Sequence, residues 1–187
     1  DENLYKQRMQ KRKEIQLKRV KERNLEKGLV IVFTGNGKGK TTAALGMGLR
    51  TLGHGYKVAI IQFIKGAWTT GEQKAFEKFS HNIEWKSLGA GFTWETQNRN
   101  QDQFLVNKAW ELAKEFIKNE SYKLVILDEI NIAIKLGYIN TEDIIIFLKD
   151  LNMNKNLCHI ILTGRGASKE IIESVSYTHL TLPTNVA

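Results

Sequence analysis

The stretch FTGNGKGKTT, residues Phe33 to Thr42, places three glycines and two lysines between an apolar run and a run of helix formers. Glycines allow backbone N–H groups to curl around phosphate oxygens, and a helix that begins just after the loop adds the positive end of its dipole. A lysine neutralises phosphate charge, and a threonine hydroxyl reaches a magnesium ion. Gly39, Lys40 and Thr41 have the residue types for these roles, so the stretch predicts a phosphate-binding P-loop.

The loop departs from the usual P-loop pattern at one position. If G-x-x-x-x-G-K-[ST] ends at Thr41, Thr34 stands where the first glycine belongs. We therefore expect a different backbone geometry at the entrance of the loop. A dinucleotide-binding loop would need glycine at Lys40 and is a poorer match. A glycine-rich turn without a ligand is the remaining alternative.

The segments that flank and follow the loop predict the fold. Four apolar runs are continuous rather than alternating, which is typical of parallel strands buried on both faces. They are Leu29–Phe33, Lys57–Phe63, Lys123–Asp128 and Cys158–Thr163, with Asn82–Leu88 as a weaker strand candidate. The helical segments are Thr41–Leu52, Asn100–Asn119, Thr141–Leu151 and Ser168–Val175. This alternation predicts an α/β domain of the three-layer P-loop NTPase-like (RecA-like) class, with a mostly parallel sheet.

A pair of carboxylates supports the phosphate site. Asp128 and Glu129 follow the apolar run KLVIL, so they are expected at the carboxyl edge of a buried strand. Ligands of open α/β sheets collect at that edge, and P-loop proteins hold an acidic group there beside the metal. Asp128 is a candidate magnesium ligand, and Glu129 is a candidate to act on a nucleophile or to hold a nucleotide hydroxyl.

Composition limits the class of protein. The 187 residues, 42% hydrophobic and 26% charged, suffice for one α/β core. No apolar stretch approaches the roughly 20 residues that span a bilayer, so we expect a cytoplasmic protein without a membrane partner. Cys158, the single cysteine, lies in an apolar run and indicates a reduced core position. The four scattered histidines do not suggest a structural zinc site.

The net charge of +8 is concentrated in the first 27 residues. They hold ten Lys/Arg against five Asp/Glu, which leaves only +3 for the other 160 residues. The segment has no glycine or proline and carries a thin apolar stripe, which predicts a basic helical arm. Such an arm is either a solvated helix or a lid or subunit contact.

Three further loops are candidates for ligand contacts. Phe92 and Trp94 lie in a glycine-flanked segment, where aromatic side chains anchor a core or face a large flat ligand. The segment after the second strand carries Lys65, Gly66 and Glu72 toward the same edge, with an ordinary connection as the alternative. Arg165, in TGRGAS, is a candidate phosphate contact or an ordinary surface arginine.

Five motifs together resemble one known family. FTGNGKGKTTAALG, QFIKG, GFTWETQN, VILDE and ILTGRG, in this order and at these spacings, are similar to the P-loop type of corrinoid adenosyltransferases. The similarity covers roughly residues 28 to 175, and the basic arm resembles the family's N-terminal helix. The combination of TGNGKGKTT with GFTWETQ is specific, whereas the P-loop alone is not.

The resemblance implies an enzyme that transfers the 5′-deoxyadenosyl group of ATP to cobalt(I) of a reduced corrinoid, with inorganic triphosphate as the leaving group. The attacked atom is then the ribose C5′ rather than the γ-phosphorus. In this family ATP lies in the reverse orientation to that in other P-loop proteins. No histidine here has the setting of a cobalt ligand, which agrees with a corrinoid that the protein does not ligate.

The resemblance also implies roles for particular residues. Lys40, Thr41 and Glu129 are expected to be catalytic, Thr41 and Asp128 to hold the metal, and Phe92 and Trp94 to lie beside the corrin. Contacts to the nucleotide and its triphosphate are expected from Thr34, Gly35, Asn36, Gly37, Lys38, Gly39, Lys40, Thr41, Thr42 and Arg165. The implied cofactor is Mg²⁺, with Mn²⁺ as an alternative.

The expected partners follow from the same resemblance. They are ATP, cob(I)alamin or another reduced corrinoid, and an external electron donor such as a flavoprotein, since no flavin or iron–sulfur signature is present. We expect a homodimer, in which each arm covers the partner's site. No nucleic-acid partner is expected.

The C-terminal segment departs from the family. SYTHLTLPTNVA, residues 176–187, is rich in threonine and leucine and carries the only proline. We expect three segments: a basic helical arm at 1–27, a P-loop domain at 28–175, and a disordered or non-native tail at 176–187 that puts activity in question.

Two other classes of function remain open at this point. An ATPase or nucleotide kinase of RecA-like fold would use the same loop and release phosphate or ADP. A nucleic-acid-binding module would work through the basic arm, although that arm lacks interleaved aromatic residues.

Overall fold

The computed structural model describes residues 2–22, 27–64, 70–79, 81–88, 99–151 and 158–180. The strands are β1 (Val30–Thr34), β2 (Lys57–Gln62), β3 (Ile83–Ser87), β4 (Tyr122–Asp128), β5 (His159–Thr163) and β6 (Tyr177–Leu180). The helices are α1 (Glu2–Glu22), α2 (Lys40–Gly53), α3 (Gly71–Phe76), α5 (Arg99–Lys118), α6 (Ile130–Lys135), α7 (Thr141–Asp150) and α8 (Lys169–Ser174), with a 3₁₀ turn at Glu77–Phe79.

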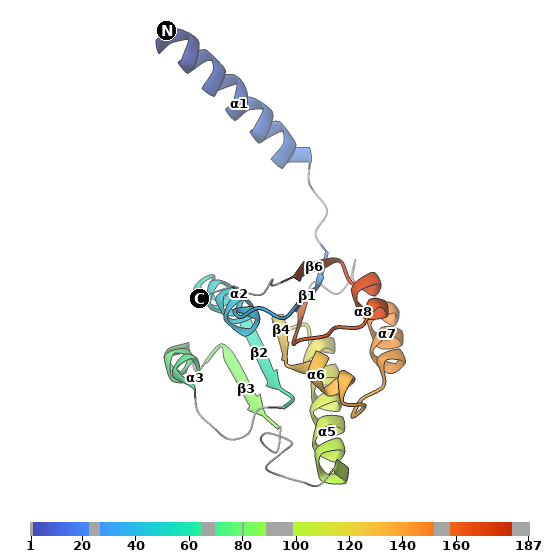
Figure 1. Cartoon of the computed structure of the whole chain (residues 1–187). Coiled ribbons are helices and arrows are strands. Elements are labelled where there is room, and N and C mark those ends of the chain that lie inside the picture. Colours follow the sequence, from blue (N-terminus) through green and yellow to red (C-terminus); the bar gives the residue numbers. More distant parts are fainter. Residues whose placement is uncertain are drawn as a thin grey trace, which may run out of the picture.

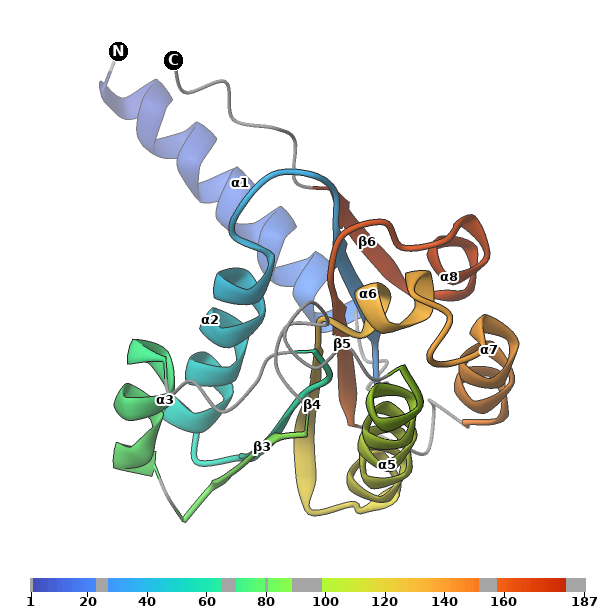
Figure 2. The same ribbon diagram turned by 60° about the horizontal axis from the view of Figure 1, so that its bottom comes forward.

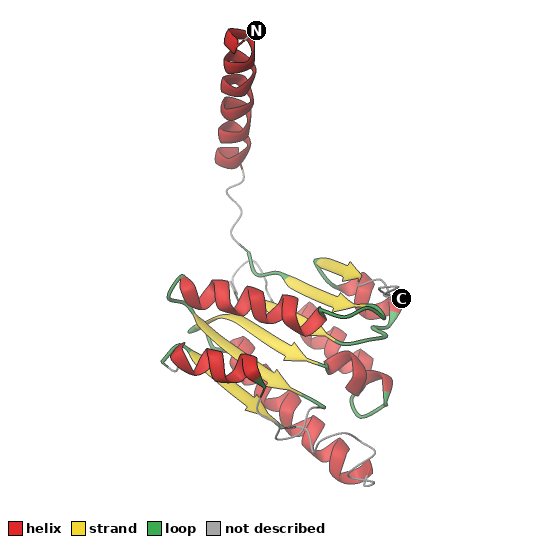
Figure 3. Ribbon diagram, turned by 60° about the vertical axis from the view of Figure 1, so that its left-hand side comes forward, coloured by secondary structure: helices red, strands yellow, loops and turns green. Residues whose placement is uncertain are grey.

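The strands form one sheet in the order β3-β2-β4-β5-β1-β6, and each neighbouring pair is parallel. The carboxyl ends of all the strands therefore meet at one edge, as Figure 3 shows. In this order β5 lies between β1 and β4. The end of β5 thus stands between the P-loop after β1 and the carboxylate at the end of β4.

Helices cover both faces of the sheet. Helices α2 and α3 lie on one face, and α5, α6, α7 and α8 lie on the other (Figure 2). Successive residues of β1 face opposite layers: Val30 and Val32 pack with the second set of helices, and Ile31 and Phe33 pack with α2. Because both faces are covered, all five residues of β1 are buried, which explains its continuous apolar run.

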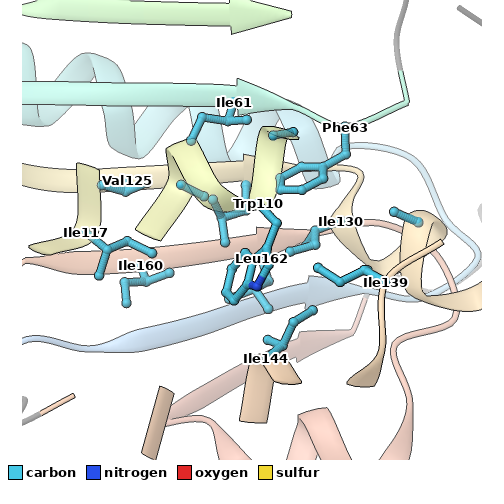
Figure 4. Packing of buried hydrophobic residues seen from close by; sticks show 14 of the residues in the cluster. Ile61, Phe63, Trp110, Ile117, Val125, Ile130, Ile139, Ile144, Ile160 and Leu162 are labelled. Atoms are coloured by element: carbon cyan, nitrogen blue, oxygen red, sulfur yellow. The ribbon is translucent and has the colours of Figure 1, made fainter. Parts of the chain in front are cut away.

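The larger core lies between the sheet and helices α5 to α8. Figure 4 shows side chains of the strands meeting Trp110 and Ile117 of α5, Ile130 of α6 and Ile144 of α7. Trp110 also meets Phe147 edge to face, with ring centroids 5.2 Å apart. Cys158 is buried in this core as a free thiol, as expected, and burial raises the pKa of Cys158 to about 12.

The predicted elements agree with the structure to within one or two residues at their ends. The four strong strands, the weaker strand at β3 and the helices α2, α5, α7 and α8 are all present. The three-layer α/β fold with a parallel sheet is therefore confirmed. Helices α3 and α6 were not predicted, because each has only six residues and shows no helical period of its own.

The expectation of disorder after residue 175 is wrong for residues 177–180. They form β6, which adds a parallel strand to the free side of β1. Ser176, just before β6, makes two hydrogen bonds with Val30 at the start of β1. Its backbone N–H donates to Val30 O at 2.8 Å, and its side-chain oxygen accepts from Val30 N at 3.2 Å. The open edge of β1 offers hydrogen-bond partners that the tail sequence does not reveal. Residues 181–187 lie outside the described residues.

Helix α1 extends away from the α/β domain in Figure 1, and none of its residues is buried. Its ion pairs lie at the i,i+4 spacing, between Lys6 and Glu2 and between Lys18 and Glu22. The helical prediction for the arm is confirmed. Among the described residues, no helix has the length and apolar character needed to cross a membrane.

Candidate active site

The P-loop spans the gap between β1 and α2. Gly35 and Gly39 have φ angles of 102° and 98°, in the left-handed region that a side chain disfavours. Gly39 caps α2 without a side-chain hydrogen bond, so the cap leaves the N–H groups of the first turn to a ligand. A helix start of this kind is suited to bind phosphate oxygens.

Lys40 is buried in the loop that precedes it. Its ammonium donates to the backbone oxygen of Gly35 at 2.9 Å and to that of Gly37. Burial lowers the pKa of Lys40 below its usual value of 10.5, and the nearby Arg165 lowers it further, whereas Glu129 raises it. These two charges come from the ends of β5 and β4, so the fold brings three predicted site residues into one electrostatic neighbourhood.

Asp128 is the centre of a hydrogen-bond network at the carboxyl edge. Thr41 donates to its Oδ1 at 2.8 Å, which joins the P-loop helix to the end of β4. Thr163, at the end of β5, donates to the same oxygen at 2.8 Å, and Gln62, at the end of β2, donates to Oδ2 at 3.0 Å. The carboxylate is 1% exposed, and these donors compensate for its burial.

Glu129 has the only positive φ, 62°, of the non-glycine residues that the structure describes. It lies at the N-cap of α6, and its backbone N–H donates to Thr163 Oγ1 at 2.9 Å. Gly164 packs closely against it, since a Cβ on that glycine would lie 3.2 Å from Glu129 Oε2. Such local strain is found at functional sites, where the surroundings hold an unfavourable conformation.

Thr34, at the position of the missing glycine, connects the P-loop to a second loop. Its hydroxyl oxygen accepts a hydrogen bond from the backbone N–H of Ala167 at 3.1 Å. Ala167 follows the turn that carries Arg165, so the entrance of the P-loop and this turn are joined. A glycine at this position could not make this contact.

Residues 26–181 match the family described as ATP:corrinoid adenosyltransferase BtuR/CobO/CobP. The match covers most of the chain, from the end of the arm through β6. This chain belongs to the ATP:corrinoid adenosyltransferase family. The resemblance first indicated by the five motifs is thus confirmed, and the chain is an enzyme of this class.

Curated corrinoid adenosyltransferases are similar to this chain over most of their length. The protein named corrinoid adenosyltransferase from a Sinorhizobium species is 45% identical over 174 residues, which cover 92% of this chain and 80% of that protein. The protein of the same name from Escherichia coli K12 is 41% identical over 169 residues, 90% of this chain and 84% of that protein.

A solved structure supports the fold alone. The flagellar accessory protein FlaH from Methanocaldococcus jannaschii has a TM-score of 0.56 and 16% identity, over 83% of this chain and 72% of that chain. It shares the α/β arrangement with this adenosyltransferase.

The structure places the predicted site residues as follows. The P-loop residues lie together after β1; Gly37 is buried, whereas Asn36, Lys38 and Thr42 are exposed. Asp128, Glu129 and the exposed Arg165 lie at the same edge. Phe92, Trp94, Lys65 and Gly66 lie outside the described residues. Glu72 lies in the first turn of α3.

Four members of the network were not predicted from the sequence motifs. Gln62 and Thr163 are buried polar residues at the ends of apolar strands, and Trp85 and Ser87 are polar partners on β3. A polar residue at the end of a continuous apolar run is a sequence signal that could have identified Gln62 and Thr163. The sequence around β3 has no comparable signal for Trp85 and Ser87.

Proposed function

We propose that this chain transfers the 5′-deoxyadenosyl group of ATP to cobalt(I) of a reduced corrinoid, with the P-loop edge of the sheet as the ATP site. Membership of the adenosyltransferase family over residues 26–181 is the observation that carries the reaction. The convergence of Lys40, Thr41 and Asp128 at one edge supports the location. The cobalt electron pair forms the bond to C5′, the C5′–O bond breaks, and its electron pair leaves with the triphosphate.

Stabilisation of the leaving triphosphate is the proposed task of the P-loop. The start of α2 directs backbone N–H groups to the loop, and Lys40 adds a buried positive charge there. Charge in a water-poor site stabilises developing negative charge more than it would in bulk water. Because cobalt(I) is itself a strong nucleophile, no residue is needed to activate the attacking atom.

Thr41 and Asp128 fit a magnesium site. They present a hydroxyl and a carboxylate oxygen 2.8 Å apart beside the P-loop, and oxygen ligands are those that Mg²⁺ prefers. The described residues contain no group of three or more His, Cys, Asp or Glu residues that could hold a metal by themselves, which suits an ion shared with substrate phosphates. When bound, the ion would neutralise part of the triphosphate charge. Mn²⁺ has a similar ligand preference.

The remaining roles rest on the family. We propose that Glu129 contacts the nucleotide, that Arg165 contacts phosphate, and that Phe92 and Trp94 lie beside the corrin. The electron donor that reduces the corrinoid would be a separate protein, such as a flavoprotein. The reaction would take place in the cytoplasm. The neighbourhood of Glu129, Arg165 and Lys40 supports the first two roles.

The test is an anaerobic assay with chemically reduced cob(I)alamin, ATP and Mg²⁺, which follows the cobalt–carbon product spectrum and the inorganic product. We expect adenosylcobalamin and triphosphate in equal amounts. Lys40→Ala should lower the rate by about 100-fold or more, as expected for loss of a charge that stabilises the transition state.

A matched control is Lys57→Ala, which removes an exposed lysine at the opposite end of a strand and should leave the rate unchanged. Release of phosphate or ADP without dependence on corrinoid would instead support the ATPase or kinase alternative.

A further inference from the structure

Gln62 links the carboxylate of Asp128 to strand β3. It lies at the end of β2, which pairs with β3 on one side and with β4 on the other. In the sheet register Gln62 is the partner of both Ser87 and Asp128. Register partners in parallel strands point to the same face, so the three side chains form one row across three strands.

The chemistry of its neighbours fixes the orientation of the Gln62 amide. Its nitrogen donates to Asp128 Oδ2 at 3.0 Å, and its oxygen accepts from Trp85 Nε1 at 3.1 Å and from Ser87 Oγ at 2.8 Å. An indole N–H can only donate, and an ionised carboxylate can only accept. A flipped amide would place N–H against N–H and oxygen against oxygen, so one orientation alone satisfies every partner.

The two oxygens of Asp128 have different partners as a result. Gln62 ties Oδ2 to β2, whereas Oδ1 accepts from Thr41 and from Thr163. Oδ1 is thus the oxygen through which the carboxylate reaches the P-loop helix. Gln62 is 2% exposed, so water does not readily replace its hydrogen bond.

We infer that Gln62 is a positioning residue for the metal-binding carboxylate, and that Trp85 and Ser87 set the orientation of its amide. This inference rests on the proposed role of Asp128 in binding magnesium. Loss of the Gln62 amide removes its hydrogen bond to Oδ2 and changes how Asp128 meets a cation that is shared with ATP.

The experiment measures ATP binding by calorimetry, with and without Mg²⁺, so that it requires no corrinoid. Gln62→Met keeps the length of the side chain and removes both hydrogen-bond functions. We expect it to reduce the magnesium-dependent gain in ATP affinity by about 10- to 100-fold, the range for a hydrogen bond to a charged group, with metal-free ATP affinity within about threefold.

Gln62→Glu provides a readout that a purely structural role would not move. Two adjacent carboxylates share a proton, and a cation must displace it. We therefore expect the affinity for MgATP in this variant to rise with pH more steeply than in the unmodified protein.

Trp85→Phe tests the hydrogen bond that Trp85 Nε1 donates to the Gln62 amide oxygen. It keeps the ring against Phe76, where the ring centroids lie 5.7 Å apart, and removes the indole N–H. We expect about a fivefold loss of the magnesium-dependent gain. Trp110→Phe makes the same chemical change in the other layer and should leave that gain unchanged.

Two results would overturn the inference. One is a folded Gln62→Met protein that keeps its full magnesium-dependent gain while Asp128→Asn loses it. The other is an Asp128→Asn protein that keeps the gain, which removes the metal role of Asp128 itself. The proposed adenosyl transfer is judged separately, by the cob(I)alamin assay on the unmodified chain.

Discussion

At the scale of single residues, Thr34 departs from the P-loop motif and has a structural role of its own. The P-loop pattern has glycine at this position, whereas Thr34 is buried and accepts a hydrogen bond from Ala167. The side chain thereby fixes the turn that carries Arg165 next to the loop. The threonine that departs from the motif therefore forms a contact between two loops, and the two bonded residues are 133 positions apart in the sequence.

Thr34→Val should destabilise the fold by about 1–3 kcal/mol, because valine has the same shape but leaves the Ala167 N–H without this acceptor. Thr34→Ser keeps the hydroxyl and should lose clearly less. The measurement is the free energy of unfolding from urea denaturation. Equal stability of the valine and serine variants would contradict the role of the hydrogen bond.

Glu129 combines backbone strain with a proposed functional side chain. A non-glycine residue in the left-handed region costs about 1–2 kcal/mol, and glycine avoids most of that cost. We expect Glu129→Gly to be as stable as the unmodified protein or up to about 1 kcal/mol more stable, while its adenosyl transfer falls sharply.

The control is Glu115→Gly, at an exposed position inside α5, which should cost about 1 kcal/mol of stability and leave activity unchanged. The two glycine substitutions should thus behave differently: Glu129→Gly loses activity without losing stability, and Glu115→Gly loses stability without losing activity. Thermal unfolding together with the cob(I)alamin assay measures them. A fall in stability of Glu129→Gly comparable to that of Glu115→Gly would argue against strain.

At the scale of secondary-structure elements, a histidine side chain joins the start of β5 to the residue that precedes β1. His159, the first residue of β5, accepts a hydrogen bond from the backbone N–H of Leu29 on its Nδ1 at 3.2 Å. Burial lowers the pKa of His159 below its usual value of 6.5, and the charge of Lys123 lowers it further. Protonation of Nδ1 would remove this acceptor.

The stability of the fold should therefore fall as the pH drops from about 6.5 toward 5. The unfolded chain takes up the proton near pH 6.5, whereas the folded chain takes it up only at lower pH, so acid favours unfolding in this window. His159→Gln should flatten that part of the pH profile. His54→Gln changes an exposed histidine and should leave it as it is. Urea denaturation at a series of pH values measures both.

At the scale of the whole molecule, the basic helix α1 lies apart from the core of the α/β domain (Figure 1). None of its residues is buried, and five large apolar side chains are about half exposed or more: Leu4, Tyr5, Ile15, Leu17 and Val20. The family resemblance suggests a homodimer in which this helix covers the partner's site. The exposed apolar side chains agree with a helix that acquires a partner.

Light scattering of the full chain and of a chain that begins at Lys27 tests this prediction. We expect the full chain to be a dimer, and the shortened chain to keep its fold by circular dichroism but to lose activity or dimerise more weakly. A full chain that remains monomeric at working concentration would contradict it. If α1 instead bound nucleic acid tightly at physiological salt, the arm would have a different partner.

The sequence was sufficient to predict the longer helices and the first five strands of this fold, and the position of its glycine-rich loop between β1 and α2. Continuous apolar runs, a glycine-rich turn and the acidic pair at 128–129 are local signals, and each follows from backbone sterics, burial or charge close to the residue concerned. For the same reason the five motifs identified the family. Local pattern did not reveal β6, because its strand structure depends on the free edge of β1.

Only the tertiary structure decided which polar groups meet at the site. The row of Ser87, Gln62 and Asp128, the hydroxyl of Thr163 between β1 and β4, and the Thr34 contact to Ala167 all join residues distant in sequence. Strand order and register bring them together, and both are set by how the whole sheet packs between its two helical layers. The sequence by itself determined the chemical groups available, and the packing of the sheet determined their neighbours.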